Sequence, residues 1–259
     1  MTKRRAQLKN KGAGAARRSS RSSVVGIPED LAAAIKRCWP RGVVEEFPTD
    51  ESYFHEIRRQ IERDLGRISG ALLVWQTEEE VGAGWDDDEA DEPLLSRSEW
   101  QSYHVFFLSP KGDEFRFEDE TIGDDPEDGT RITYPGEGRF GLALTISLAA
   151  PFAAIDASCY SWFEDGSIAF PDPTFRLFWD EETGEAVSPN EYYRDLFGQE
   201  MFQKLEILRQ AVVSIMASHR ISVLDEAVLD LPVKGLKADQ EVFVDKRLHV
   251  RDAFFFRGV

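Results

Sequence analysis

Cysteine is scarce in this chain, which has only Cys38 and Cys159 among its 259 residues. Two cysteines cannot build the disulfide framework that stabilises small secreted domains. The sequence also lacks a run of about 20 uncharged apolar residues, so we expect no membrane span. No apolar segment follows the basic residues near the N-terminus, which excludes a secretory signal. Together these absences predict a cytoplasmic protein that does not enter membranes.

Motifs of common catalytic and ligand-binding sites are missing as well. The chain has no G-x-x-x-x-G-K-[ST] phosphate loop, no G-x-G-x-x-G that leads from a strand into a helix, and no G-x-S-x-G nucleophile elbow. Asp124 begins a segment similar to a calcium loop, but Pro135 stands where the twelfth-position glutamate belongs. The cysteines and histidines offer no short metal-ligand pair. We therefore expect neither a cofactor nor a metal ion.

Acidic residues dominate the charge. The 48 acidic and 31 basic residues give a formal net charge of −17. Residues 1–26 hold eight of the basic residues and no acid, so subtracting their +8 leaves −25 on the other 233 residues. With few apolar residues to bury, we expect 1–26 to be a disordered basic tail. Three interpretations of this tail stay open. It is a solvated arm without a specific role, an arm that binds a polyanion such as nucleic acid or docks on the acidic body, or an organellar targeting segment.

Two blocks concentrate the acids. Residues 78–92 contain nine acids and no base, and residues 113–128 contain nine acids with Arg116 as the only base. Because like charges repel, we expect solvated acidic loops near 77–98 and 119–138. The alternative is a negative docking surface for a basic protein partner, with an aromatic anchor. Its candidate partner-binding residues are Trp85, Asp86, Asp87, Asp88, Glu89, Asp91 and Glu92.

Helical signals occur at both ends of the remaining chain. Residues 28–39 begin with proline and acids and end before Pro40, which predicts a first helix. A second helix is expected from about residue 49 to 66, because its apolar residues recur at steps of three and four. Ser188, Pro189 and Glu191 form a capping box for a long helix that ends near His219 and bends near Gly198.

Strand signals fill the middle of the chain. We expect strands at 70–76, 103–108, 114–118, 140–148, 157–163, 167–170, 175–179, 241–244 and 250–256, with hairpins at the 109–112 turn and at Asp165-Gly166. The fold class is therefore α+β. We expect one domain over 27–259, with a mostly antiparallel sheet of about six to eight strands on which two N-terminal helices and the long helix pack.

Individual side chains give few candidates for catalysis. Asp156, Glu164 and Asp172 each fall near the end of an expected strand, where carboxylates act in general acid–base chemistry or stabilise turns. His104 fits a hydrogen-bonded core histidine better than a base. A cysteine–histidine nucleophile pair stays open, because such partners meet only in space.

The function expected from these patterns is binding without catalysis. An acidic surface would capture a basic protein partner, in the manner of an immunity-type inhibitor that covers a cationic toxin or nuclease. We expect no nucleic acid to bind the acidic body, because a charge of −25 repels phosphate, but such binding stays open for the basic tail. The alternative is a hydrolase that uses carboxylate or metal-assisted chemistry. The sequence does not determine the oligomeric state.

Overall fold

The computed structural model describes residues 27–44, 53–77, 102–124, 130–169, 178–179, 186–238 and 248–255. The α-helices in these residues are α1 (Glu29–Cys38), α2 (Tyr53–Leu65), α3 (Pro189–Ser218), α4 (Glu226–Leu229) and α5 (Val250–Phe254), and η2 (Asp113–Phe115) is a short 3₁₀ turn. The strands are β1 (Val43–Val44), β2 (Ala71–Gln76), β3 (Tyr103–Pro110), β4 (Arg116–Asp124), β5 (Arg131–Ser147), β6 (Phe152–Phe163), β7 (Ile168–Ala169), β8 (Phe178–Trp179), β9 (Ala186–Val187), β10 (Ser222–Val223) and β11 (Lys237–Ala238).

A seven-stranded sheet forms the centre of the described structure. Its order is β10-β6-β5-β3-β2, with β4 also paired to β5 and β7 also paired to β6. Every pair in this sheet is antiparallel except β10 with β6. The predicted α+β fold with a mostly antiparallel sheet is therefore confirmed. No helix in the described residues combines the length and the apolar character needed to cross a membrane.

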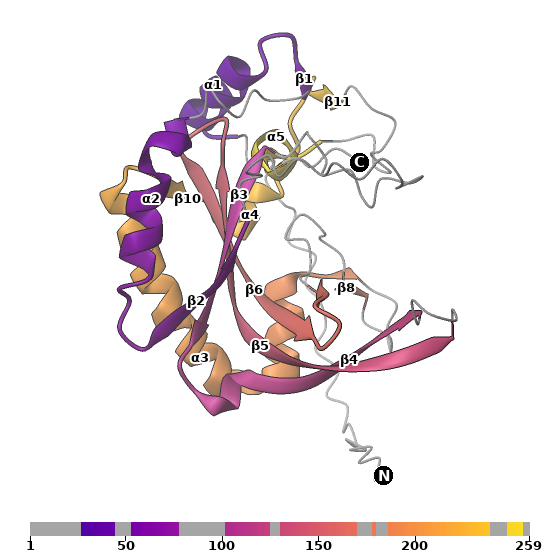
Figure 1. Ribbon diagram of the computed structural model, residues 1–259. Coiled ribbons are helices and arrows are strands. Elements are labelled where there is room, and N and C mark those ends of the chain that lie inside the picture. Colours follow the sequence, from indigo (N-terminus) through magenta and orange to yellow (C-terminus); the bar gives the residue numbers. More distant parts are fainter. Residues whose placement is uncertain are drawn as a thin grey trace, which may run out of the picture.

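Helices cover both faces of the sheet (Figure 1). One core cluster joins α2 and α3 to Phe106, Leu142 and Leu144, which are almost completely buried. The other joins α1, α4 and α5 to the opposite face, where Ala143 lies. Alternate residues of β5 thus enter different cores, as expected for a strand that is covered on both sides.

Helix α3 follows its local sequence signals closely. The Ser188 hydroxyl accepts the backbone N–H of Glu191, and the Glu191 carboxylate accepts the backbone N–H of Ser188, which is the predicted capping box. Gly198 has a φ of +77° and breaks the regular helix, so the expected bend is present. At the other end, His219 Nε2 lies 3.0 Å from Asp64 Oδ2, which ties α3 to the end of α2.

The predicted hairpin between the strands at 103–108 and 114–118 is wrong. Strand β3 pairs with β2 on one edge and β5 on the other, so it has no edge left for β4. Instead β4 pairs with β5 along Arg131–Arg139, beside the stretch that β3 occupies. Since β5 is 17 residues long, one edge accommodates both partners. Residues 119–124 and 131–138 are therefore strand rather than the expected acidic loop.

The expected strand at 250–256 is also wrong, because Val250–Phe254 is helix α5. His249 and Asp252 form a capping box at its start. Val250, Ala253 and Phe254 are buried at steps of three and one, the pattern of one helical face. A five-residue apolar segment does not distinguish a strand from a short helix, and here the capping side chains favour the helix. The other expected C-terminal strand, 241–244, lies outside the described residues.

Candidate partner-binding groove

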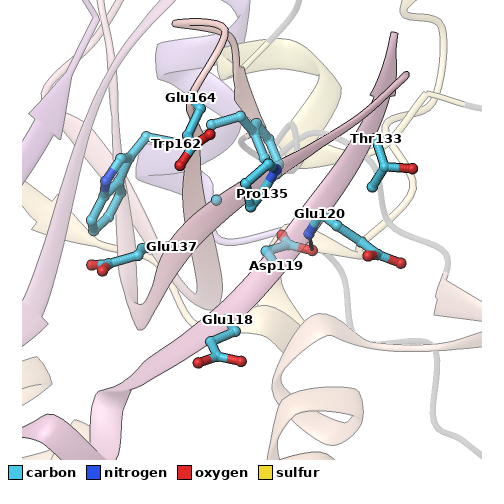
Figure 2. Close-up of a pocket in the computed structure, with 10 residues that line it drawn as sticks. Glu118, Asp119, Glu120, Thr133, Pro135, Glu137, Trp162 and Glu164 are labelled. Carbon is cyan, nitrogen blue, oxygen red and sulfur yellow. Dashed lines mark hydrogen bonds between the residues drawn. The ribbon is translucent and has the colours of Figure 1, made fainter. Parts of the chain in front are cut away.

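A groove with a volume of about 970 Å³ lies where the β4–β5 hairpin meets the end of β6 (Figure 2). Five of the lining residues are acidic and none is basic. We call this feature the acidic groove. Its lining residues are Glu118, Asp119, Glu120, Thr133, Pro135, Gly136, Glu137, Trp162, Phe163 and Glu164.

One row of the groove crosses three strands. Glu118 on β4 lies opposite Glu137 on β5, and Glu137 lies opposite Trp162 on β6. Two like charges directly opposite one another destabilise a sheet. Arg116 offsets part of this repulsion, because its Nη2 bonds Glu137 Oε2 at 2.5 Å, and that bond raises the pKa of the Arg116 guanidinium.

A second row lies about 7 Å further along the strands, the distance between alternate residues. Glu120 lies opposite Pro135, whose carbonyl accepts the backbone N–H of Glu164 at 3.0 Å. Asp119 lies between these two rows along β4 but on the face opposite Glu118 and Glu120, and it forms two hydrogen bonds. Its Oδ2 accepts the Ser161 hydroxyl at 2.7 Å and its Oδ1 accepts the backbone N–H of Glu120 at 2.9 Å. The second bond is the dashed line in Figure 2.

Two glycines of β5 allow the strands to pack closely beneath the groove. A Cβ at Gly138 would collide with the ring of Phe117. A Cβ at Gly136 would collide with the ring of Phe163 and lie 2.6 Å from the Trp162 carbonyl oxygen. The aromatic rings of β4 and β6 therefore cross over β5 on the face opposite the glutamates. This packing brings β4, β5 and β6 close together beneath the groove.

The carboxylates of Glu118, Glu120 and Glu164 are not paired with cations in the described structure. Each of these side chains is exposed, and no ion pair or hydrogen bond joins its carboxylate to another described residue. Glu137 differs from these three glutamates, because it forms an ion pair with Arg116. The groove thus presents three carboxylates that have no cation partner among the described residues.

Apolar side chains lie beside these charges. Trp162, Ile168 and Ile122 are three of the large hydrophobic residues that remain exposed, at 36%, 50% and 63%. Trp162 lies directly opposite Ile168 on β7, and Ile122 lies opposite Thr133, which lines the groove. A surface that combines carboxylates with exposed apolar side chains suits a partner with both basic and apolar groups.

The partner-binding residues predicted from sequence lie elsewhere in the chain. All of them fall within residues 78–101, outside the described structure, so their role stays a prediction. The set is Trp85, Asp86, Asp87, Asp88, Glu89, Asp91 and Glu92. The second acidic block, in contrast, supplies three lining residues of the groove: Glu118, Asp119 and Glu120.

The three candidate carboxylates for acid–base chemistry do not form one site in the described residues. Asp156 is buried in the middle of β6 and bonds Arg251 Nη1 through Oδ2 at 3.0 Å. Glu164 lines the groove, eight residues further along the chain, which in an extended strand is about 26 Å. Asp172 lies outside the described residues.

The thiols do not form a nucleophile pair with histidine among the described residues. Cys38 Sγ lies 3.4 Å from the Ala149 carbonyl oxygen, and Cys159 Sγ lies 3.4 Å from the Tyr193 hydroxyl. Burial raises the pKa of both thiols, which disfavours the reactive thiolate. Among the residues that the structure describes, no group of three or more His, Cys, Asp or Glu residues is arranged to hold a metal ion.

His104 is buried, as expected for a core histidine. The hydrogen bond expected for such a histidine is absent at one ring nitrogen in the described structure. Its Nε2 has no partner in the described structure. The ring lies between Phe54 and Phe106, with centroid distances of 5.2 and 4.6 Å. Burial lowers the pKa of His104 to about 3, and the positive charge of Arg58 contributes to the shift. This histidine is therefore neutral at pH 7 and poorly placed to exchange protons with solvent.

Sequence reasoning missed Glu137 and Trp162 as members of the groove. Glu137 sits between two glycines in a segment expected to be loop, and Trp162 was one apolar residue within an expected strand. Their juxtaposition depends on the pairing register of β4, β5 and β6. The alternation of glutamates at 118 and 120 was the available signal, because alternate residues of a strand share one face.

Comparisons of the chain with protein-family models, with curated proteins and with solved structures gave no match.

Proposed function

We propose that this chain is a binding protein that captures a basic protein partner in the acidic groove. The observation that carries the proposal is the set of carboxylates of Glu118, Glu120 and Glu164, which have no cation partner in the described part of the chain and lie beside the exposed Trp162. Complementary charge accelerates encounter and selects for cationic partners. A partially exposed aromatic ring supplies an anchor for an arginine or an apolar side chain.

Inhibition of a cationic toxin or nuclease is the specific form of this proposal. Such enzymes bind phosphate through clustered lysines and arginines, and a curved surface of carboxylates would cover those groups. The strongly acidic body supports this form, because its field extends beyond the groove and steers a cationic enzyme toward it.

The hydrolase alternative receives less support from the described residues. Asp156 bonds Arg251 within the core, and both thiols are held in the protonated form by burial. The glutamates of the groove are exposed to water, whereas acid–base catalysts are commonly tuned by burial or by close charged neighbours. These features favour a surface for contact over a site for chemistry.

The charges of the groove are tested with one triple variant. Glu118→Gln/Glu120→Gln/Glu164→Gln, the groove variant, is expected to bind a fluorescein-labelled octa-arginine peptide about tenfold more weakly, since each exposed ion pair contributes about 0.5 kcal/mol. For this comparison both proteins also carry glutamine in place of Lys3, Arg4, Arg5, Lys9 and Lys11, so that basic residues of the same chain do not compete with the peptide. Fluorescence anisotropy at 50 mM salt measures the affinity. Raising the salt to 0.5 M should weaken wild-type binding strongly, because the charges are then screened beyond about 4 Å.

A second triple variant serves as the matched control. Glu56→Gln/Asp195→Asn/Glu200→Gln, the control variant, removes the same charge from exposed positions on α2 and α3, away from the groove. It should bind the peptide like the wild type. Equal weakening by both variants would show that net charge alone attracts the peptide, and the groove would then lose its assigned role.

The aromatic anchor is tested separately. Trp162→Ala is expected to weaken peptide binding about tenfold, through the loss of cation–π contact and apolar area worth about 1 to 2 kcal/mol. Leu196→Ala removes an exposed apolar residue from α3 and should leave the affinity unchanged. An unchanged affinity for Trp162→Ala would exclude Trp162 as an anchor.

The natural partner is sought by pull-down from cell lysate with three proteins: the wild type, the control variant and the groove variant. A partner that belongs to the groove should be recovered from lysate of the source cells by the wild type and by the control variant. It should be lost with the groove variant and at 0.5 M salt. Basic proteins recovered equally by all three proteins would count against the proposal.

A further inference from the structure

The first 26 residues have the charge that the acidic groove lacks. They carry eight basic residues and no acid. Five of the eight fall within residues 3–11, which also include the apolar Leu8. The segment therefore has the same chemistry, basic groups with an apolar side chain, as the partner proposed for the groove.

The spacing of these basic residues also fits the groove. Lys3 and Arg5, and likewise Lys9 and Lys11, are two positions apart. In an extended backbone such side chains project from one face about 7 Å apart. The same distance separates the two rows of the groove, because Glu118 and Glu120 are alternate residues of β4.

The connection to the described structure gives the segment enough reach. Residue 27 is the first described residue, and α1 begins at Glu29. A chain of 26 residues has a mean end-to-end distance of about 30 Å and extends to about 90 Å. A compact body of this size has a radius of gyration of about 17 Å, so every point on its surface is within range.

We propose that residues 1–26 bind the acidic groove of their own chain and compete with the basic partner. This inference rests on the proposed function, because it assigns regulation to the same groove. Tethering places the basic segment near the groove at an effective concentration in the millimolar range. If the segment binds with a dissociation constant of about 0.1 mM in trans, it lowers the affinity for a partner about tenfold. Partners with affinity high enough to displace the segment are thereby selected over weak polycations.

Carbodiimide crosslinking tests the contact directly in the full-length protein. The reagent joins lysine amines to neighbouring carboxylates, and mass spectrometry locates the bonds. We expect crosslinks from Lys3, Lys9 or Lys11 to Glu118, Glu120 or Glu164. These crosslinks should disappear at 0.5 M salt. In the control variant they should persist and join the same glutamates.

Isotope labelling distinguishes contact within one chain from contact between two chains. In a mixture of ¹⁴N- and ¹⁵N-labelled protein, an intramolecular contact gives crosslinked peptides that both carry the same isotope. Mixed-isotope crosslinks, or bonds spread over acids outside the groove, would overturn the inference.

Peptide binding separates this inference from the proposed function. Replacement of Lys3, Arg4, Arg5, Lys9 and Lys11 with glutamine should increase the affinity for octa-arginine about tenfold. In the groove variant, the same five replacements should have no effect. If the groove variant weakens binding but the five replacements change nothing, the groove binds basic partners and the self-docking inference is wrong. If octa-arginine binds all proteins equally, the proposed function is wrong, and the crosslinks alone decide whether the segment docks.

Discussion

Replacement of Asp156 with alanine is expected to lower the free energy of unfolding by about 3 to 5 kcal/mol. Asp156 and Arg251 form an ion pair whose side chains are only 5% and 7% exposed. Arg251 Nε has no hydrogen-bond partner in the described structure, so the carboxylate is the principal compensation for the buried guanidinium. Loss of the carboxylate leaves an unpaired charge in the core between β6 and α5. Urea denaturation followed by circular dichroism measures the change.

Two further variants distinguish a broken ion pair from general damage to the core. Asp156→Val/Arg251→Met removes both charges at similar total volume and should recover most of the lost stability, because apolar replacement of a buried pair is often neutral or better. Asp195→Ala, on the exposed side of α3, should change stability by less than about 0.5 kcal/mol. A loss below about 1 kcal/mol for Asp156→Ala would mean that water reaches Arg251.

His104 is expected to make the protein sensitive to mild acid. The pKa of His104 is about 3 in the folded protein against 6.5 for an unperturbed histidine. As the pH falls below about 6.5, the unfolded chain takes up the proton first, so stability decreases by about 1.4 kcal/mol per pH unit. The loss of stability that His104 causes reaches about 3 kcal/mol at pH 4.5 and stops growing near pH 3.

The His104 contribution is isolated by comparing two variants with the wild type. His104→Leu should lose less stability than the wild type between pH 7 and pH 4.5, by about 3 kcal/mol. His55→Gln, at an exposed position of α2, should keep the wild-type pH dependence. If the stability of the wild type and that of His104→Leu fall equally between pH 7 and pH 4.5, His104 becomes protonated within the folded state and the prediction is wrong.

Burial of Asp156 against Arg251 was not visible in the sequence, whereas burial of His104 was expected. Asp156 was one of three carboxylates near expected strand ends, and the cation that it bonds belongs to a segment that was expected to be a strand. A helix at Val250–Phe254 brings Arg251 to the middle of β6, which no local pattern indicates. His104 was recognised as a core residue because apolar residues flank it on both sides.

Local sequence signals were enough to predict the helical features that depend on contacts between near neighbours in the chain. Ser188 and Glu191 cap α3 through bonds between residues three positions apart, and Gly198 bends it through its own backbone conformation. The buried residues Phe54, Ile61 and Leu65 recur at helical spacing and identify the packed face of α2. These features depend on near neighbours in the chain, so the sequence alone determined them.

Tertiary structure decided which strands pair and therefore what the groove contains. The sequence determined that residues 113–128 are strongly acidic and that glutamates alternate at 118 and 120. Whether those residues form a loop or a strand depended on the length of β5, which accommodates β3 and β4 along one edge. The same pairing brought Glu137, Trp162 and Glu164 beside them. Strand pairing joins residues distant in the chain, and its register is fixed by burial of whole faces, so only the folded chain could bring these side chains together.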